Sequence, residues 1–244
     1  MPPLTGKAAV VTGGATGIGR AIAVALAGEE CQVAIAGRRT DALREAADSW
    51  RGEPPLFFHR IDVTDRASVA AFFQWADQQL GKVDILVNNA GINTPRRTLA
   101  DISPETWDQV LEINATGTYN CMAAVLPQMR SRRDGLIVNI GSVSGKRASL
   151  LGGVAYCASK FAVSALSTAA ALEEGKNGIR VTSICPGEVD TPILEHRPTS
   201  LSAEHRARIL RPEDIAAAML MVACLPARAH VPELIIKPTW QDYA

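Results

Sequence analysis

Hydrophobic residues along the chain alternate between short β-branched runs and longer amphipathic, alanine-rich runs. The short runs predict seven strands, at residues 8–12, 32–36, 56–61, 84–87, 136–140, 180–184 and 233–236. The longer runs predict helices at residues 17–27, 41–50, 67–80, 103–129, 155–174 and 212–225. The sequence Ser-Pro-Glu-Thr at 103–106 is a capping pattern that opens the longest of these helices.

Strands that are apolar on both sides and separated by helices are typical of a parallel sheet covered on two faces. The alternation covers 1–244 without a linker or a repeat, which predicts a single doubly wound α/β domain with about seven parallel strands. The only long irregular stretch is 186–211. Because a loop of that length in a compact domain is usually functional, we predict that it forms a substrate lid.

Composition excludes several classes of partner. The 244 residues carry 25 basic and 25 acidic side chains, and this zero balance argues against nucleic acid and against a polybasic membrane surface. The longest apolar run, 215–227, is broken by Pro226 and is too short to span a bilayer. Five scattered cysteines predict reduced thiols in the cytoplasm, and the spacing of the four histidines predicts no metal site.

A glycine-rich turn follows the first predicted strand and leads into a helix. Its candidate cofactor-binding residues are Gly13, Thr16, Gly17, Ile18 and Gly19. Glycines allow the tight turn and the close approach of a pyrophosphate, while the helix N-terminus offers free N–H groups to that anion. The strand–turn–helix context favours a dinucleotide site over a plain structural turn.

The end of the second strand bears on which dinucleotide is bound. NAD-binding proteins usually place an acidic residue there to hold the ribose 2′-hydroxyl. This chain has Gly37 followed by Arg38 and Arg39, and a guanidinium can pair with a 2′-phosphate. The pattern therefore favours NADP over NAD, with ordinary surface charges as the alternative interpretation of the two arginines.

Three further patches lie where predicted elements begin or end. The sequence Asn-Asn-Ala-Gly at 88–91 follows the fourth strand, Ser142 follows the fifth, and Tyr156 and Lys160 open the next helix. Tyr and Lys four residues apart share a helical face, and a nearby ammonium is expected to lower the tyrosine pKa from about 10. A tyrosine tuned in this way can exchange a proton near neutral pH.

These motifs, in this order, resemble the short-chain dehydrogenase/reductase family in its single-domain branch, which has a Rossmann fold. The resemblance extends from about residue 7 to 236 and rests on the glycine turn, 88–91, Asn114, Ser142, Tyr156, Lys160, Pro186 and Gly187. It implies that Tyr156 exchanges the proton, that Ser142 binds the substrate oxygen, and that Lys160 binds the nicotinamide ribose and tunes Tyr156. It also implies that Asn114 holds a relay water, although this residue could instead fix a helix bend.

The resemblance further implies a set of cofactor contacts. Asp62 and Val63 would flank the adenine, Ile18 would lie against the phosphates, and Thr191 would contact the nicotinamide carboxamide. The remaining implied contacts are Asn89, Ala90, Gly91, Pro186, Gly187 and Val189, together with Tyr156 and Lys160.

Two departures from the family pattern concern the substrate end. Thirteen residues, 143–155, separate Ser142 from Tyr156, one more than the commonest spacing, and a bulge within 149–153 is expected to reshape the pocket. The tail 231–240 lacks the Gly-Gly turn of many relatives and looks like that of an NADP-dependent subgroup containing 3-hydroxy-acid dehydrogenases.

The leading hypothesis is an NADP-dependent carbonyl reductase or 3-hydroxy-acid type dehydrogenase. Alternatives are a 3-oxoacyl-thioester reductase and a catalytically degenerate NADP-binding sensor or scaffold. Basic residues in 190–209, with Lys146 and Arg147, could recognise an acidic substrate or carrier, or form a solvated face. The family also predicts homodimers or homotetramers built on the helices 103–129 and 155–174, with the tail 240–244 on a partner subunit.

Overall fold

A computed structural model describes residues 4–197 and 201–242. It contains one seven-stranded sheet with the order β3-β2-β1-β4-β5-β6-β7, in which every neighbouring pair is parallel. The strands are β1 Ala8–Thr12, β2 Gln32–Gly37, β3 Leu56–Arg60, β4 Ile85–Asn88, β5 Gly135–Ile140, β6 Ile179–Pro186 and β7 Glu233–Ile236. The predicted doubly wound Rossmann fold and its seven strands are confirmed.

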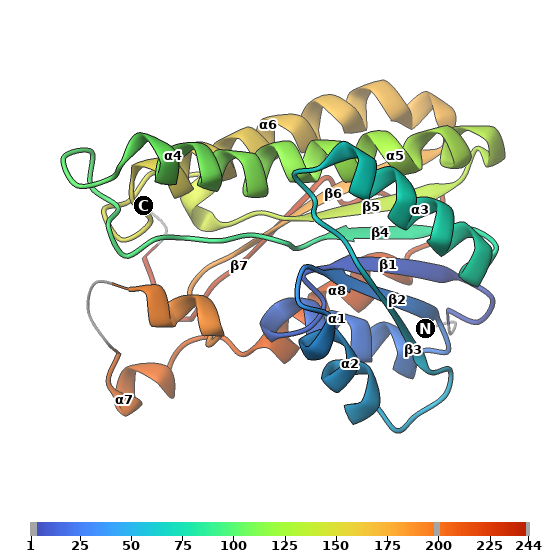
Figure 1. Ribbon diagram of the computed structural model, residues 1–244, viewed down its shortest axis with the longest axis horizontal. Coiled ribbons are helices and arrows are strands. Elements are labelled where there is room, and N and C mark those ends of the chain that lie inside the picture. Colours follow the sequence, from blue (N-terminus) through green and yellow to red (C-terminus); the bar gives the residue numbers. More distant parts are fainter. Residues whose placement is uncertain (1–3, 198–200, 243–244) are drawn as a thin grey trace.

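Helices cover both faces of the sheet, as Figure 1 shows. The helices are α1 Gly17–Gly28, α2 Thr40–Ser49, α3 Arg66–Leu80, α4 Pro104–Leu111, α5 Gly117–Arg132, α6 Val154–Glu174, α7 Ala203–Arg206 and α8 Pro212–Ala223. Alternate residues of β1 serve the two cores, since Ala9 and Val11 belong to one buried cluster and Ala8 and Val10 to the other. The first cluster packs against α1 and α8, and the second against α3, α5 and α6.

The single helix predicted for 103–129 is wrong in one respect. Ser103 does cap α4 by accepting from the Thr106 N–H, but a π-turn at Glu112–Thr116 separates α4 from α5. The π-turn holds Asn114, whose side chain is bonded outside its own helix, and Gly117 packs so tightly against Val63 that an added Cβ would lie 2.5 Å from Val63 Cγ2. A π-helical turn contains one residue more than a regular helical turn. This extra residue accommodates both the side-chain bonds of Asn114 and the packing of Gly117 on Val63.

The segment predicted as an irregular lid is partly ordered into short helices. A 3₁₀ turn forms at Pro192–His196 and α7 follows at Ala203–Arg206. A bridge between Val189 and Leu210 closes the base of the segment. Of its residues, 198–200 lie outside the described part of the chain.

One stretch of the described chain, Val154–Asn177, is long and apolar enough by length and composition to cross a membrane. It comprises α6 and the turn after it. In the structure this helix packs on β6 and contributes Ala155, Val163 and Ala170 to the buried interior.

The strand order reverses between β1 and β4, and the hydroxyl of Thr12 connects their ends. Thr12 Oγ1 accepts from the backbone N–H of Asn89 at 3.0 Å and of Ala90 at 3.1 Å. Asn89 Nδ2 donates back to the carbonyls of Thr12 and Gly13 at 3.1 Å each. These bonds join the turn after β1 to the turn after β4 at the point where open α/β sheets bind ligands.

Replacing Thr12 with valine would keep the shape of this buried side chain and leave two N–H groups without their acceptor. Thr12→Val should therefore reduce the free energy of unfolding by about 2–4 kcal/mol in urea titrations. Thr12→Ser keeps the hydroxyl and is the matched control. A clear loss in Thr12→Ser with none in Thr12→Val would show that the methyl group, and not the hydroxyl, stabilises this junction.

Candidate active site

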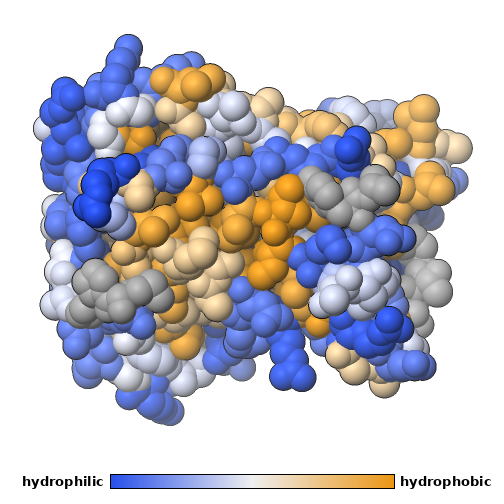
Figure 2. Space-filling model, turned by 180° about the vertical axis from the view of Figure 1, so that it is seen from behind, coloured by the Kyte–Doolittle hydropathy of each residue, from blue (hydrophilic) through white to orange (hydrophobic). Residues whose placement is uncertain are grey.

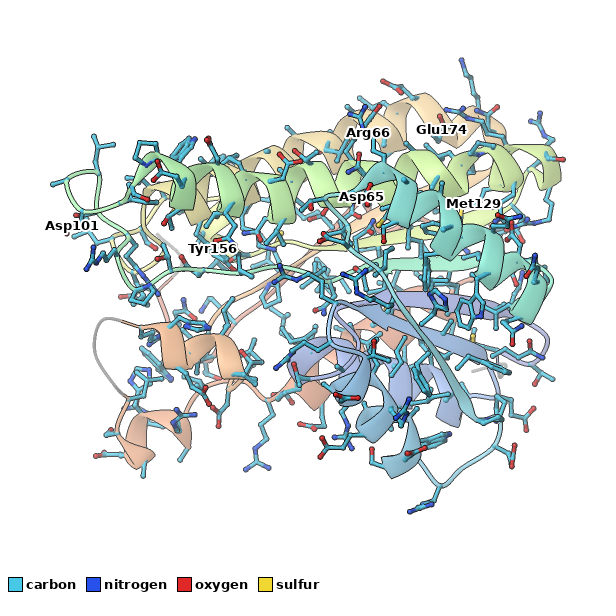
Figure 3. The ribbon with its side chains drawn as sticks, in the orientation of Figure 1. Asp65, Arg66, Asp101, Met129, Tyr156 and Glu174 are labelled. Atoms are coloured by element: carbon cyan, nitrogen blue, oxygen red, sulfur yellow. The ribbon has the colours of Figure 1, made fainter. Side chains whose placement is uncertain are left out.

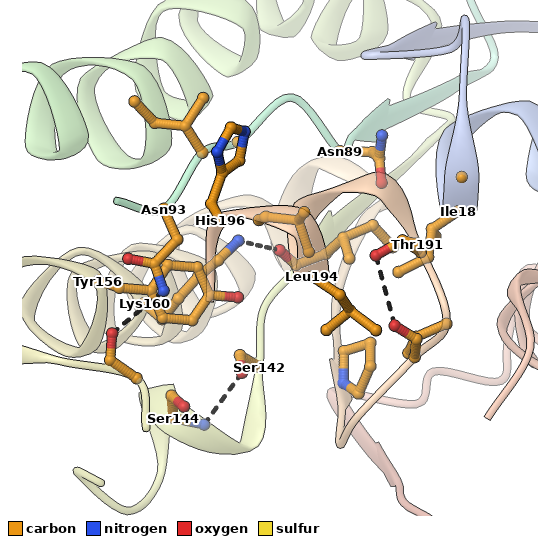
Figure 4. A pocket seen from close by; sticks show the side chains of 18 of the residues that line it. Ile18, Asn89, Asn93, Ser142, Ser144, Tyr156, Lys160, Thr191, Leu194 and His196 are labelled. Carbon is orange, nitrogen blue, oxygen red and sulfur yellow. Dashed lines mark hydrogen bonds between the residues drawn. The ribbon is translucent and has the colours of Figure 1, made fainter. Parts of the chain in front are cut away.

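A cavity of about 720 Å³ runs along the carboxyl ends of the strands. Figure 4 shows part of its lining. The predicted site residues that line it are Gly13, Thr16, Gly17, Ile18, Arg38, Arg39, Asp62, Val63, Asn89, Ala90, Gly91, Ser142, Tyr156, Lys160, Pro186, Gly187, Val189 and Thr191. Gly19 and Asn114, which were also predicted, are buried and do not line it.

The glycine turn brings the start of α1 to the cavity. Gly13 and Gly17 have φ of +64° and +54°, a region that favours glycine. A Cβ on Gly19 would lie 2.3 Å from the Gly13 carbonyl, so this glycine permits close packing inside the turn. Thr16 is the N-cap of α1 but makes no side-chain cap bond, and the first turn contains no acidic residue. The free N–H groups and the positive end of the helix dipole therefore suit a phosphate.

The end of β2 is basic and open. Arg38 and Arg39 are exposed, line the cavity, and form no ion pair within the described part of the chain. An added Cβ on Gly37 would meet only Leu43, at 3.8 Å. The adjacent Asp62 carboxylate accepts from the Thr64 hydroxyl and N–H, and these bonds lower the pKa of Asp62.

Asn114 connects three elements from within the π-turn. Its Oδ1 accepts from the Ile92 N–H at 2.8 Å, and its Nδ2 donates to the Ile92 carbonyl and to Ser159 Oγ, both at 3.0 Å. It therefore fixes the loop after β4 against α6 from within an interrupted helix. Its role in holding a water stays a prediction.

Ser142, Tyr156 and Lys160 converge from the end of β5 and the start of α6 (Figure 4). Ser142 is buried, and its Oγ accepts from the Ser144 N–H at 3.1 Å. Lys160 Nζ donates to the Ile140 carbonyl at 2.8 Å and lies 5.6 Å from the centroid of the Tyr156 ring. Tyr156 stands at the cavity end of α6, far from Glu174 at the other end of that helix (Figure 3).

Burial dominates the ionisation of this pair. It lowers the pKa of the Lys160 ammonium from 10.5 to about 8. It raises the pKa of Tyr156 above 10, although the side chain of Ser142 and the charge of Arg97 act in the opposite direction. The expectation that Lys160 would lower the Tyr156 pKa is therefore wrong for the protein alone, because desolvation of the phenol outweighs the charge effects on it.

Sequence reasoning missed Arg97, which also lines the cavity. It lies in the loop between β4 and α4, directly after the exposed Arg96. Its guanidinium bonds the carbonyls of Thr94, Leu151 and His196. Two adjacent arginines in a polar loop are typical of solvated charge, so no local signal could have singled out this residue.

Three of the residues in 149–153 lie in the cavity wall, while the expected reshaping of the pocket by a bulge stays a prediction. Ser149, Leu151 and Gly152 line the cavity, and Asn93 Nδ2 donates to the Gly152 carbonyl at 3.1 Å. Gly153 has φ of +79° and packs directly on Arg97.

Most of the basic cluster in 190–209 is paired within the chain. Glu188 contacts both Arg197, at 3.0 Å, and His205, at 2.8 Å, while Arg206 contacts Asp190. Lys146 pairs with Glu233. These residues therefore fit the structural interpretation of the cluster better than recognition of an acidic ligand. Arg147 differs, since it is exposed and lines the cavity.

The C-terminal tail packs on its own chain. Trp240 Nε1 donates to the Arg208 carbonyl at 2.8 Å, and Gln241 Oε1 accepts from the Glu188 N–H at 3.1 Å. Gln241 and Asp242 also line the cavity. The structure thus places 240–242 against the 186–211 segment, whereas 243–244 lie outside the described residues.

The low pKa of Lys160 predicts a pH-dependent stability. Below pH 8 the folded protein carries the cost of a buried charge, which disappears as the ammonium loses its proton between pH 8 and 10.5. Relative to Lys160→Met, the wild-type free energy of unfolding should rise by about 3 kcal/mol across this window. Urea titrations at several pH values would measure the rise. Lys176→Met, at an exposed lysine, is the control, and a flat difference for Lys160→Met would contradict the prediction.

Comparisons with known proteins agree with this geometry. Residues 7–201 match the family model described as short chain dehydrogenase. An uncharacterized oxidoreductase of Staphylococcus aureus is 35% identical over 239 residues, covering 98% of this chain and 100% of that protein. A glycine betaine reductase of Emericella nidulans is 36% identical over 242 residues, which cover 97% of this chain but only 19% of that longer protein.

A solved structure has the same architecture. The closed form of a serine dehydrogenase complexed with NADP+ superposes with a TM-score of 0.89 at 31% identity, covering 97% of each chain. With the match over 7–201, these findings show that the chain belongs to the short-chain dehydrogenase/reductase family of NAD(P)-dependent oxidoreductases that act on CH–OH groups.

Proposed function

We propose that the protein is an NADP-dependent oxidoreductase that interconverts a carbonyl compound and a secondary alcohol, as a ketone reductase or a 3-hydroxy-acid type dehydrogenase. The observation that carries this proposal is that one cavity has Ser142, Tyr156 and Lys160 at one end and two exposed arginines, Arg38 and Arg39, at the other. The serine dehydrogenase of similar structure, which is complexed with NADP+, supports the choice of cofactor.

The cavity wall fits a dinucleotide phosphate in both charge and shape. The uncapped start of α1 would hold the pyrophosphate, and Arg38 and Arg39 would hold the 2′-phosphate. Asp62 and Val63 would flank the adenine, while Asn89, Ala90 and Gly91 would line the path towards the nicotinamide, where Pro186, Gly187, Val189 and Thr191 close the other side. When bound, NADP(H) supplies or accepts the hydride.

The residues of the chain would position the substrate and move the proton. Ser142 would donate a hydrogen bond to the substrate oxygen, and Tyr156 would give its hydroxyl proton to that oxygen during reduction or take it during oxidation. Lys160, mostly protonated at pH 7, would bind the nicotinamide ribose and favour the phenolate of Tyr156 as the proton leaves. Asn114 would hold a relay water beside this group. The 186–211 segment would act as a lid, since several of its residues line the cavity.

The proposal includes a cytoplasmic homodimer or homotetramer. Tyr119 on α5 and Phe161 and Leu172 on α6 are exposed apolar residues on the two helices expected to form an interface. Hydrophobic side chains also gather across the face opposite the view of Figure 1, as Figure 2 shows. All five cysteines are free thiols, which suits a reducing compartment.

The cofactor preference can be measured by titrating the protein with NADPH and NADH while following tryptophan fluorescence. NADPH should bind more tightly, and Arg38→Ala or Arg39→Ala should each weaken NADPH roughly 10- to 100-fold while changing NADH little, because only NADPH carries the 2′-phosphate. Arg44→Ala, an exposed arginine on α2 outside the cavity, is the control. Tighter binding of NADH would reverse the preference and keep the enzyme class.

Turnover distinguishes an enzyme from a cofactor sensor. In a screen of small ketones with NADPH, Tyr156→Phe should lower kcat/KM by roughly 100- to 10,000-fold and leave the Kd for NADPH within about threefold of the wild type, since only the proton donor is removed. Tyr119→Phe, at an exposed tyrosine, is the control. Tight NADPH binding without turnover of any ketone or alcohol by the wild type would favour the sensor or scaffold alternative.

A further inference from the structure

Arg97 is a buried cation in the wall of the cavity. Its exposed fraction is 6%, and it lines the same cavity as Ser142 and Tyr156. It belongs to the loop that follows β4, in which the neighbouring Arg96 is exposed and does not line the cavity. Burial of a long charged side chain is uncommon unless a partner compensates its charge.

The protein provides acceptors for only some of the N–H donors of the Arg97 guanidinium. Nε donates to the Thr94 carbonyl at 2.8 Å, Nη1 to the Leu151 carbonyl at 2.5 Å and Nη2 to the His196 carbonyl at 2.7 Å. A guanidinium has five N–H donors, so two remain on the Nη atoms. Because Arg97 lines the cavity, these two hydrogens are the donors that it has left for a ligand there.

No carboxylate compensates the charge of Arg97 within the described part of the chain. The nearby Arg197 is paired with Glu188, and both burial and the charge of Arg197 lower the pKa of Arg97. A guanidinium nevertheless stays protonated at neutral pH. Carbonyl dipoles reduce the cost of burying this charge, but an anion would reduce it further.

Arg97 is also tied to the catalytic end of α6. Its carbonyl accepts from the N–H of Val154, the first residue of that helix and two residues before Tyr156. A Cβ added to Gly153 would lie 2.4 Å from Arg97 Cβ, so the two residues are in close contact. The charge of Arg97 acts on the pKa of Tyr156, so an anion bound by Arg97 would lie at the same end of the cavity as a carbonyl group held at Tyr156.

We propose that Arg97 is the specificity-determining residue of this cavity and binds the carboxylate of a short hydroxy acid or of the corresponding oxo acid. This inference rests on the proposed function, and it selects the acid class within it. Arg147 is exposed at the cavity, where solvent screens its charge, so its contribution should be smaller.

The test compares an acid with its neutral ester. Racemic 3-hydroxybutanoate and methyl 3-hydroxybutanoate are each oxidised with NADP+, which accepts the hydride from C3 while the hydroxyl proton leaves through Tyr156, giving the 3-oxo compound, NADPH and H+. The wild type should prefer the acid. Arg97→Gln should lower kcat/KM for the acid roughly 100-fold and that for the ester no more than about threefold, because only the acid loses a buried charge-assisted contact.

Three further variants separate the carboxylate role from others. Arg97→Lys keeps the charge and should retain part of the preference for the acid. Arg96→Gln, the exposed neighbour, should leave the preference unchanged. Equal losses for acid and ester in Arg97→Gln would show that Arg97 only holds its loops together, and would overturn the proposal. So would loss of the preference in Arg147→Gln but not in Arg97→Gln.

Ligand binding tests whether Arg97 binds a carboxylate even if neither alcohol is oxidised. Butanoate should bind the NADPH complex at least about tenfold more tightly than butanamide, as followed by NADPH fluorescence, and Arg97→Gln should abolish this difference. Equal binding of the two probes to the wild type would overturn the proposal. Failure of the wild type to bind NADPH, or to turn over any ketone or alcohol, whether acidic or neutral, would instead count against the proposed function itself.

Discussion

The junction between β1 and β4 is the constraint on which the cavity depends. A parallel sheet whose strand order reverses leaves a gap at its carboxyl edge, because consecutive connections depart to opposite sides. The Thr12 hydroxyl and the Asn89 amide hold the two departing turns together through bonds in both directions. With that gap fixed, the start of α1 and the loop after β4 form its two walls. Both the proposed phosphate contacts and the position of Arg97 follow from these walls.

The second constraint is the interrupted helix between α4 and α5. Asn114 can bond both backbone groups of Ile92 and Ser159 on α6 because the π-turn reorients it relative to a regular helix. The same loop that Asn114 fixes at Ile92 continues to Arg97, which contacts Leu151 and His196. The irregular helix and the buried arginine thus fix one loop at two points, Ile92 and Arg97, and both of these residues line the cavity.

The sequence was sufficient for those features that are tied to the ends of regular elements. Strand periodicity located all seven strands, and Gly13, Ser142 and Tyr156 could be placed because each follows a strand or opens a helix. The π-turn could not be predicted, since apolar spacing continues through it. Arg97 could not be found either, because its partners Leu151 and His196 are 54 and 99 residues away and only tertiary packing brings them together. Ionisation at Tyr156 was misjudged because spacing reveals a neighbouring charge but not the extent of burial.

Four charged side chains are buried in the described part of the chain, and they fall into two pairs with different surroundings. Asp84 and Glu174 belong to the scaffold, and each contacts at least one basic side chain. Lys160 and Arg97 line the cavity and bond only carbonyl oxygens. An unpaired buried charge is costly. If Lys160 and Arg97 served only the stability of the fold, they would therefore be expected to have acidic partners, as Asp84 and Glu174 have basic ones. Their lack of an acidic partner in the described chain leaves two basic side chains in the cavity wall near Tyr156, which suits the anionic substrate group that we propose.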